Sequence, residues 1–125
     1  MIFNNEKAIY LQIADRLSDE ILTGVYADDD RIPSVREYGA LLEVNTNTVV
    51  KAYDDLSRAN IIYNKRGLGY FVTPGAREQI MKQRRTEFLT RTLPELCHNM
   101  RLLGISIEDI KREWEKEGNA DFSVK

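Results

Sequence analysis

The residues best suited to recognising another molecule are small polar side chains at the predicted start of one helix. They are Asn45, Thr46, Asn47 and Thr48, with Lys51 one turn further on. Amide and hydroxyl groups both donate and accept hydrogen bonds, so they suit the edges of DNA bases and the oxygens of phosphates. The first turn of a helix also presents free backbone N–H groups to a phosphate. This pattern favours a surface that reads nucleic acid.

Two basic sites accompany this polar cluster. Arg36 lies one turn into the preceding predicted helix, where it can reach a phosphate or a guanine edge. Lys65, Arg66 and Gly67 occupy the tip of a predicted β-hairpin, where two cations and a residue without a side chain can approach the DNA backbone or the minor groove. Simpler roles remain open, since Asn45 can be only a helix cap and a basic hairpin tip can be only a solvated turn. The combination and order of these features favour DNA binding.

An amphipathic helix is predicted over Ala8–Leu22. Apolar residues recur there at a spacing of four, while Gln12 is expected on the polar side. Gly24 is a natural stop, because glycine readily takes the left-handed conformation that closes a helix. The segment Tyr26–Arg31 follows as a polar connection, and its three aspartates are expected to lie in a solvated loop. The apolar residues expected to face inward are Ile9, Ile13, Leu17 and Ile21.

Two short helices after this connection predict a helix-turn-helix motif, in which the second helix enters the major groove of DNA. Ser34 and Glu37 form a capping-box pattern that starts the first of them. Asn45 is a good N-cap for the second, whose apolar residues follow the i, i+3, i+4, i+7 spacing of one buried face. Asn60 is expected to end this second helix in a left-handed turn. The inward face of the first helix is expected to be Val35, Tyr38, Leu41 and Leu42.

A β-hairpin is predicted directly after the motif. Ile61–Asn64 and Tyr70–Thr73 are rich in β-branched and aromatic residues, and two glycines turn the chain between them. The predicted fold is therefore mainly α with a small β-hairpin. It comprises a winged helix-turn-helix DNA-binding domain over residues 1–74, followed by a short all-helical dimerisation region over residues 75–125.

The region 75–125 is predicted to pair two copies of the chain. Five of its apolar residues are spaced 4, 3, 4 and 3 apart, which is the seam pattern of a helix that packs lengthwise on a partner. Pro94 lies inside this run and must kink the helix or split it near Thr92, because proline removes a backbone hydrogen bond and crowds the preceding turn. A last helix starts at Ser106, and the chain after Gly118 is expected to fray. The residues expected to form the dimer contact are Leu89, Leu93, Leu96, Met100, Leu103, Ile107, Ile110 and Trp114.

Composition and charge limit the classes of function. The 125-residue chain is 42% hydrophobic and 30% charged, which fits one domain with a small appendage rather than a disordered chain. Its net charge of −2 rules out bulk positive charge as the source of DNA affinity, so a local basic surface is required. No apolar run approaches the roughly 20 residues of a membrane helix. The first residues lack a secretory signal pattern, so a cytoplasmic location is expected.

No residue set predicts an enzyme, a metal site or a bound cofactor. Cys97 is the only cysteine, so neither an intrachain disulfide nor a zinc cluster of thiolates can form. Cys97 and His98 are adjacent and on a helix would point about 100° apart, so they cannot face one substrate as nucleophile and base. His98 is also the only histidine, which makes a metal site unfavourable.

A family resemblance is carried by the block IPSVREYGALLEVNTNTVVKAYDDLSRANIIYNKRGLGYFV and by the helix before it. Over Ile9–Thr73 the chain resembles the winged-helix domain of GntR-family bacterial transcription regulators. The region that follows is too short for the large effector-binding domains of most of these regulators. It is similar instead to the small helical dimerisation region of the YtrA subfamily.

The resemblance assigns roles to residues already singled out. Arg36 takes the place of the family's DNA-contacting arginine, and Arg66 and Gly67 fall at the tip of the wing. The recognition helix begins at residues 45–48, with Lys51 one turn on.

Two residues depart from the family pattern. Glu43 stands in the turn of the motif where glycine is usual, and it places a negative charge near the expected phosphate path. Asn60 stands where glycine is frequent after the recognition helix, but asparagine tolerates the left-handed conformation.

These features together predict a homodimeric, sequence-specific transcription regulator, namely a repressor that binds double-stranded DNA at a pseudo-palindromic operator. One small winged helix makes few phosphate contacts, so useful affinity requires two linked copies. The alternative is a winged helix that serves as a protein-interaction or assembly module without direct DNA binding. The resemblance further implies control by an unidentified small-molecule effector or by the level of the protein.

Overall fold

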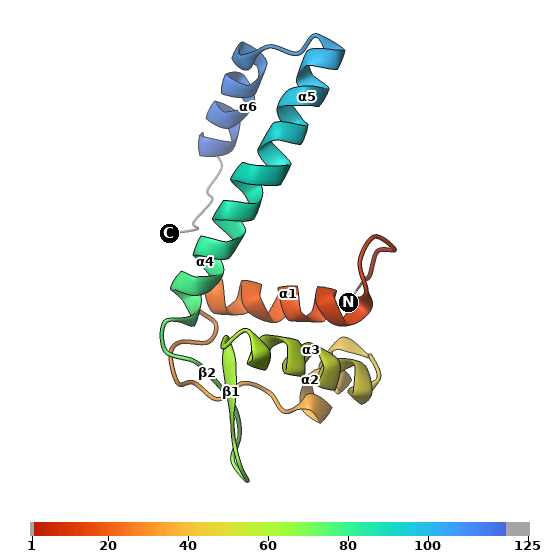
Figure 1. Cartoon of the computed structure of the whole chain (residues 1–125), viewed down its shortest axis with the longest axis vertical. Coiled ribbons are helices and arrows are strands. Elements are labelled where there is room, and N and C mark those ends of the chain that lie inside the picture. The colour runs from red at the N-terminus through yellow and green to blue at the C-terminus, as the bar shows by residue number, and fades with distance from the viewer. Residues whose placement is uncertain (1, 120–125) are drawn as a thin grey trace. The chain divides into compact units, whose positions relative to one another are not determined.

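The computed structural model is mainly helical and contains one two-stranded antiparallel hairpin, which confirms the predicted fold class (Figure 1). The structure describes residues 2–119, with side chains up to Lys116, so the predicted fraying after Gly118 lies largely outside the described residues. The chain divides into two compact units, residues 1–82 and 83–125. None of the described helices is long and apolar enough to cross a membrane.

Three helices form the core of the first unit, namely α1 (Ile9–Leu22), α2 (Val35–Leu42) and α3 (Thr46–Arg58). α3 packs against both α1 and α2, because each helix buries an apolar face at these contacts. The helices therefore form where the periodic spacing placed them. The predicted inward residues that are buried in α1 and α3 are Ile13, Leu17, Ile21, Val49, Ala52, Tyr53 and Leu56.

α1 differs from the prediction at two residues. Gln12, expected on the polar side, is buried, while Ile9, expected inside, has 45% of its surface exposed. The Gln12 amide donates hydrogen bonds to the carbonyl oxygens of Asn4 (2.9 Å) and Lys7 (2.8 Å), and it accepts one from the Asn4 N–H (3.2 Å). Because these partners satisfy the amide, it can be buried without the penalty of an unpaired polar group. The segment before α1 thereby covers this side of the helix.

α2 begins with the predicted capping box. The Ser34 hydroxyl accepts a hydrogen bond from the Glu37 N–H (3.1 Å), and the Glu37 carboxylate accepts one from the Ser34 N–H (2.8 Å). These hydrogen bonds favour the ionised carboxylate, so they lower the pKa of Glu37. The start of α2 is thus fixed by two residues that are close in sequence.

The apolar face of α2 is rotated from the predicted one. Tyr38 and Leu42 are buried as predicted, but Leu41 is 63% exposed, so its predicted inward position is wrong. Gly39 is buried instead. The turn into α3 passes so close to it that a Cβ on Gly39 would lie 3.2 Å from the Val44 carbonyl oxygen. The closest helix contact therefore uses a residue without a side chain, and Leu41 is left at the surface.

The predicted hairpin forms from β1 (Ile62–Lys65) and β2 (Gly69–Val72). The strands pair antiparallel, with Ile62 opposite Val72. Both of these residues are buried against the helices, whereas the turn between the strands is exposed. The hairpin therefore has a buried base and a free tip.

A third segment, residues 29–32, pairs with the hairpin and completes the wing. The Ile32 N–H donates a hydrogen bond to the Tyr70 carbonyl oxygen (3.0 Å), and the Val72 N–H donates one to the Asp30 carbonyl oxygen (3.0 Å). The segment thus pairs with the free edge of β2. The three aspartates are exposed, as predicted for a solvated loop, but the backbone of this segment also pairs with a strand that lies far away in the sequence.

The side chains of Asp28 and Asp29 also have specific partners. The Tyr63 hydroxyl donates a hydrogen bond of 2.7 Å to Asp29, and the Gly75 N–H donates one of 3.3 Å to Asp28. The bond to the Asp29 carboxylate raises the pKa of Tyr63. These contacts tie the segment to β1 and to the residues that precede the next helix.

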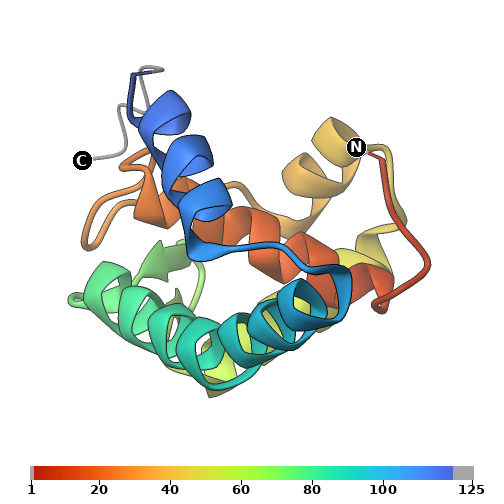
Figure 2. The same cartoon turned by 90° about the horizontal axis from the view of Figure 1, so that it is seen from above.

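The helices that follow the wing are α4 (Ala76–Glu87), η1 (Phe88–Thr92), α5 (Leu93–Leu103) and α6 (Ile107–Asn119). Ala76 and Ile80 of α4 belong to the core of the first unit. The chain stays helical up to and through Pro94, because the wider π-helical turn of η1 directly before it accommodates the proline (Figure 2). The disruption predicted near Thr92 therefore takes the form of a π-helical turn, and the helix is not split.

Candidate nucleic-acid interface

The polar cluster begins at the N-terminus of α3, as predicted. Asn45 is the N-cap, and its side-chain oxygen accepts a hydrogen bond of 2.8 Å from the Asn47 N–H. The oxygen is thereby used within the protein, while the exposed amide N–H groups can donate to another molecule. Capping and recognition are thus compatible in one side chain, because they use different atoms.

The residues of this cluster differ in exposure. Asn45 and Asn47 are exposed, whereas Thr46 and Thr48 are half-buried. The Thr46 hydroxyl oxygen would lie 3.5 Å from a Cβ on Gly39, so it faces the contact between α2 and α3. The outermost donors at the start of α3 are therefore the two asparagines.

Lys51 lies one turn after the cluster and contacts α1. Its Nζ atom is 4.8 Å from the centroid of the Tyr10 ring, which is a cation–π distance. An exposed contact of this kind contributes roughly 0.5–1 kcal/mol, which is less than the roughly 1.5–3 kcal/mol of a hydrogen bond to a charged group. The ammonium group is therefore held beside α3 but can exchange this contact for a phosphate.

The wing tip is a tight turn that displays basic residues. The Leu68 N–H donates a hydrogen bond of 2.8 Å to the Lys65 carbonyl oxygen, and Gly67 has a φ of +78°. The Lys65 Nζ atom lies 4.9 Å from the centroid of the Phe71 ring. Arg66 and Gly67 remain exposed at the tip.

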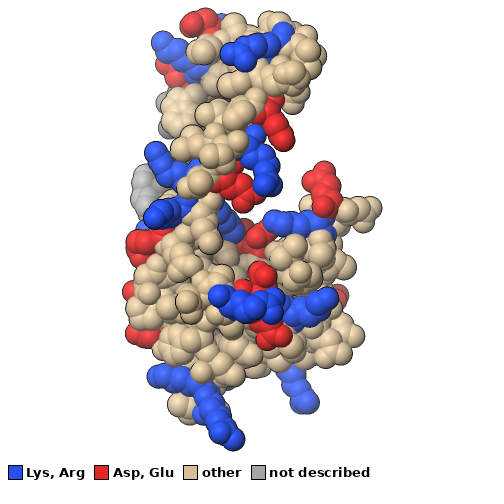
Figure 3. All heavy atoms as spheres, in the orientation of Figure 1, with Lys and Arg blue, Asp and Glu red and all other residues tan. Residues whose placement is uncertain are grey.

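The predicted cations flank α3 on its neighbouring elements. Arg36 is exposed in the first turn of α2, and Lys65 and Arg66 are exposed on the hairpin. Figure 3 shows Lys and Arg side chains projecting from the lower edge of the first unit, where Figure 1 places the hairpin and α2. Basic side chains therefore surround the helix-turn-helix motif, although the net charge of the chain is negative.

The turn between α2 and α3 contains a residue in an unfavourable conformation. Glu43 has a φ of 58° and a ψ of 47°, which is the left-handed region. This region costs a residue with a Cβ about 1–2 kcal/mol relative to the right-handed one. Glycine would suit the position better. Asn60 is also left-handed, with a φ of 61°, as predicted for the residue that ends α3.

Arg31 was not singled out in the sequence, yet it lies beside the wing. It is exposed, and its Nε–H donates a hydrogen bond of 3.2 Å to the Leu68 carbonyl oxygen. The two residues are 37 positions apart. No local pattern signals this contact, because it depends on the pairing of residues 29–32 with β2.

The second unit displays the predicted dimer-contact residues on its surface. Leu103, Ile107 and Trp114 are 73–77% exposed. Within the described residues, no side chain after Ile80 is buried. A set of apolar side chains this exposed is typical of a surface that binds another protein. The other five predicted residues are less exposed than these three, and they are Leu89, Leu93, Leu96, Met100 and Ile110.

The only cysteine and the only histidine lie next to each other on α5. Cys97 is a half-buried free thiol, and His98 is exposed. Among the side chains that the structure describes, no three His, Cys, Asp or Glu residues are placed to hold a metal ion. The chemistry that the candidate interface offers is hydrogen bonding and positive charge.

Comparison with known proteins agrees with this arrangement. The family described as bacterial regulatory proteins, gntR family, matches residues 9–72, which include the three helices and the hairpin. The HTH-type transcriptional repressor YtrA of Bacillus subtilis (strain 168) is 34% identical over 113 residues, which are 90% of this chain and 85% of that protein.

Solved structures show the same similarity. A GntR-family transcriptional regulator from Bacteroides thetaiotaomicron superposes with a TM-score of 0.72 and 45% sequence identity, over 86% of this chain and 95% of that chain. The N-terminal domain of AraR, solved in complex with mutant ORR3, superposes with a TM-score of 0.53 and 28% identity. That match covers 56% of this chain and all of the AraR domain.

Proposed function

Since the chain belongs to the gntR family of bacterial regulatory proteins, we propose that it represses transcription as a homodimer on a pseudo-palindromic operator. It is a DNA-binding transcription regulator with a winged-helix fold. Its similarity to a protein named as a repressor, over most of both chains, supports repression. It would act in the cytoplasm, where bacterial DNA is transcribed.

The observation that carries the proposal is the placement of exposed donors at the start of α3, between two basic elements. Asn45 and Asn47 offer amide groups that suit base edges in the major groove. Arg36 on α2 and Arg66 on the wing lie on the elements that flank α3, and they suit phosphates on either side of the groove. Base reading and backbone anchoring would thus come from adjacent parts of one compact unit.

The remaining residues of the proposed interface extend these two roles. Thr46 and Thr48 would support the asparagines at base edges or phosphates, and Lys51 would leave the Tyr10 ring for a phosphate. Lys65 and Gly67 would bring the wing tip against the backbone or the minor groove.

Dimerisation is proposed for residues 75–125, through the exposed apolar residues of η1, α5 and α6. A single winged helix makes few phosphate contacts, so two linked copies would be needed for tight binding. The exposed leucines of α5 and Trp114 of α6 would be buried by a second copy of the chain. An effector is implied only by the resemblance to other GntR regulators, and we propose no site for it.

Selection of bound duplexes from a random pool tests the proposal directly. The expected result is one enriched sequence with two inverted half-sites, whose spacing reports the geometry of the dimer. Binding to this sequence should weaken steeply between low and moderate salt, because phosphate contacts release counterions. Equal, salt-insensitive binding to random duplexes would refute the proposal.

Charge reversal distinguishes a DNA-binding surface from a protein-interaction module. Arg36→Glu and Arg66→Glu should each abolish operator binding, because they replace proposed phosphate contacts with repulsion. Arg58→Glu is the matched control, since Arg58 is an exposed residue in the last turn of α3, at the opposite end from the cluster. If all three variants bind DNA equally, the winged helix does not use this surface for DNA.

A further inference from the structure

The Arg31 side chain lies along the wing rather than extending freely into solvent. Its backbone forms an antiparallel bridge with Phe71 on the edge of β2. Its Nε–H donates to the carbonyl oxygen of Leu68, the residue that follows the exposed Gly67 at the wing tip. The guanidinium group is therefore anchored beside the tip by one of its five donors.

Gly69 makes room for this side chain. A Cβ added at Gly69 would lie 3.1 Å from the Arg31 Nε atom, which is closer than such contacts allow without a shift. Gly69 also has a φ of +112°, a conformation that disfavours other residues. The second glycine of the hairpin, which the sequence suggested only as a turn former, is thus the point where Arg31 packs against the strand.

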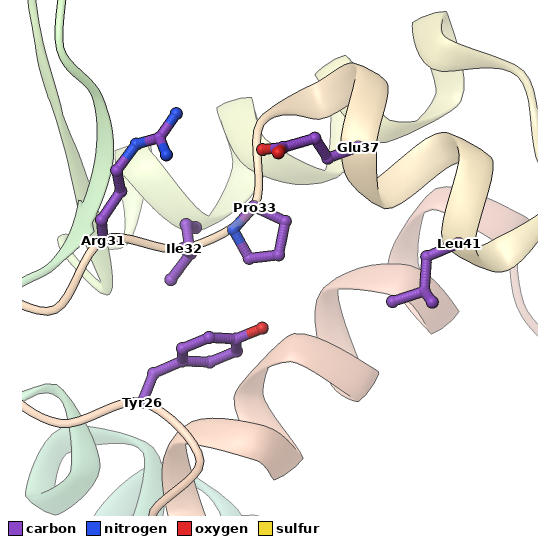
Figure 4. Close-up of a pocket in the computed structure, with 6 residues that line it drawn as sticks. All are labelled: Tyr26, Arg31, Ile32, Pro33, Glu37 and Leu41. Atoms are coloured by element: carbon purple, nitrogen blue, oxygen red, sulfur yellow. The ribbon is translucent and has the colours of Figure 1, made fainter.

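The guanidinium group of Arg31 also faces the start of α2. It lines an open cleft of 380 Å³ together with Tyr26, Ile32, Pro33, Glu37 and Leu41 (Figure 4). Figure 4 shows the Arg31 guanidinium and the Glu37 carboxylate extending toward each other beside Pro33. The Glu37 carboxylate is already bound by the Ser34 N–H in the capping box.

No carboxylate in the described part of the chain is within ion-pair distance of Arg31. Besides the hydrogen bonds from Ser34, the charge of Arg31 lowers the pKa of Glu37, so an incoming anion competes with this carboxylate for the terminal N–H groups of the guanidinium. They lie between the wing tip and the helix turn that carries Arg36. Both of these are proposed to contact the DNA backbone.

We propose that Arg31 is a further DNA-contacting residue, which binds a backbone phosphate between the contacts of the wing tip and those of α2. This inference rests on the proposed function. A phosphate suits the group, because a guanidinium fork matches phosphate oxygens with two parallel hydrogen bonds. The hydrogen bond to Leu68 holds the fork in place before DNA arrives, so less side-chain freedom is lost on binding. The same tether limits its reach, which favours the backbone over the floor of a groove.

The variant Arg31→Gln isolates the charge. The amide nitrogen of glutamine is as many bonds from Cα as Nε of arginine, so the donor to the Leu68 carbonyl oxygen can be kept while the charge is removed. We expect an unchanged melting temperature and about tenfold weaker binding at low salt to both the operator and an unrelated duplex. The slope of log K against log salt concentration should become shallower by about 0.9, the value of one phosphate contact.

Arg58→Gln is the matched control, because it removes an exposed arginine from the end of α3 opposite the cluster, and it should leave the slope unchanged. An equal slope in the wild type and Arg31→Gln would overturn the inference. A loss confined to the operator would also overturn it, since that result indicates base reading. If Arg31→Gln does not fold, Arg31→Met removes the charge while keeping much of the aliphatic side chain, and a wild-type slope in that variant would equally overturn the inference.

The two proposals fail in different ways. Absence of salt-dependent operator binding by the wild-type protein would refute the proposed function. Normal wild-type binding combined with a wild-type slope in Arg31→Gln would refute only the role of Arg31.

Discussion

The Tyr53 hydroxyl donates a hydrogen bond of 2.7 Å to the carbonyl oxygen of Pro33, which joins the inward face of α3 to the residue before the capping box of α2. The Tyr53 ring is buried and lies edge-on to Tyr70 of β2, with ring centroids 5.0 Å apart. Burial raises the pKa of Tyr53, so its hydroxyl remains a donor at all physiological pH values. One side chain of the proposed recognition helix thus contacts both elements that carry the flanking cations.

Removing this hydroxyl should loosen the motif. Tyr53→Phe leaves the Pro33 carbonyl without its donor, and we expect the free energy of unfolding to fall by about 1–2 kcal/mol. Chemical denaturation measures this change. Tyr70→Phe is the control, because it removes a hydroxyl from the ring that packs against Tyr53 and leaves the hydrogen bond to Pro33 in place. Equal stability of the two variants would show that the bond to Pro33 contributes nothing.

The capping box of α2 should make stability depend on pH. Hydrogen bonds from Ser34 lower the pKa of Glu37 below its ordinary value of 4.5, so the ionised carboxylate is favoured in the folded state. Its contribution is therefore present above pH 4.5 and is lost as the pH falls below that value. We expect wild type to be more stable than Glu37→Gln at neutral pH, with the difference shrinking in acid.

Thermal unfolding of both proteins across this pH range tests the assignment. Ser34→Ala should lower stability by about 1 kcal/mol at neutral pH, because it removes the other half of the box. A difference between wild type and Glu37→Gln that does not change with pH would mean that the charge of Glu37 is not what stabilises the cap.

Glycine at position 43 should stabilise the protein. Glu43 is exposed and left-handed, so Glu43→Gly relieves the conformational penalty but adds freedom to the unfolded chain. The expected net gain is up to about 1 kcal/mol in the free energy of unfolding. Glu43→Ala removes the same charge but keeps the Cβ, so it should give no comparable gain. Equal gains in both variants would trace the effect to the charge rather than to the backbone.

The apolar face of the second unit should control the oligomeric state. Leu96→Asp places a charge in the predicted seam, and we expect sedimentation to show a monomer and operator affinity to fall by about 100-fold or more. His98→Asp introduces the same side chain on the polar side of α5 and should remain dimeric. A dimeric Leu96→Asp protein that still binds the operator tightly would exclude this seam as the dimer contact.

Local patterns in the amino-acid sequence were sufficient to place the elements of the fold. The capping box of Ser34 and Glu37, the left-handed Asn60 and the disruption near Thr92 all appear where they were predicted. Each depends on neighbours within one or two helical turns, so the hydrogen bonds that create it are visible in the residue spacing. The polar cluster at the start of α3 was predictable for the same reason.

Contacts between different segments of the chain, which a helical or strand period does not specify, decided which side chains are buried and which support the candidate interface. Gln12 is buried because the preceding segment supplies its partners, and Leu41 is exposed because Gly39 occupies the close contact with the turn into α3. Arg31 reaches the wing only because its segment pairs with β2. The hydrophobic period of a helix or strand shows which side chains share one face, but not which part of the protein that face contacts. The residues proposed to read DNA could therefore be predicted from local spacing. The anchoring of Arg31 beside them could not, because it arises from strand pairing across 37 positions of the chain.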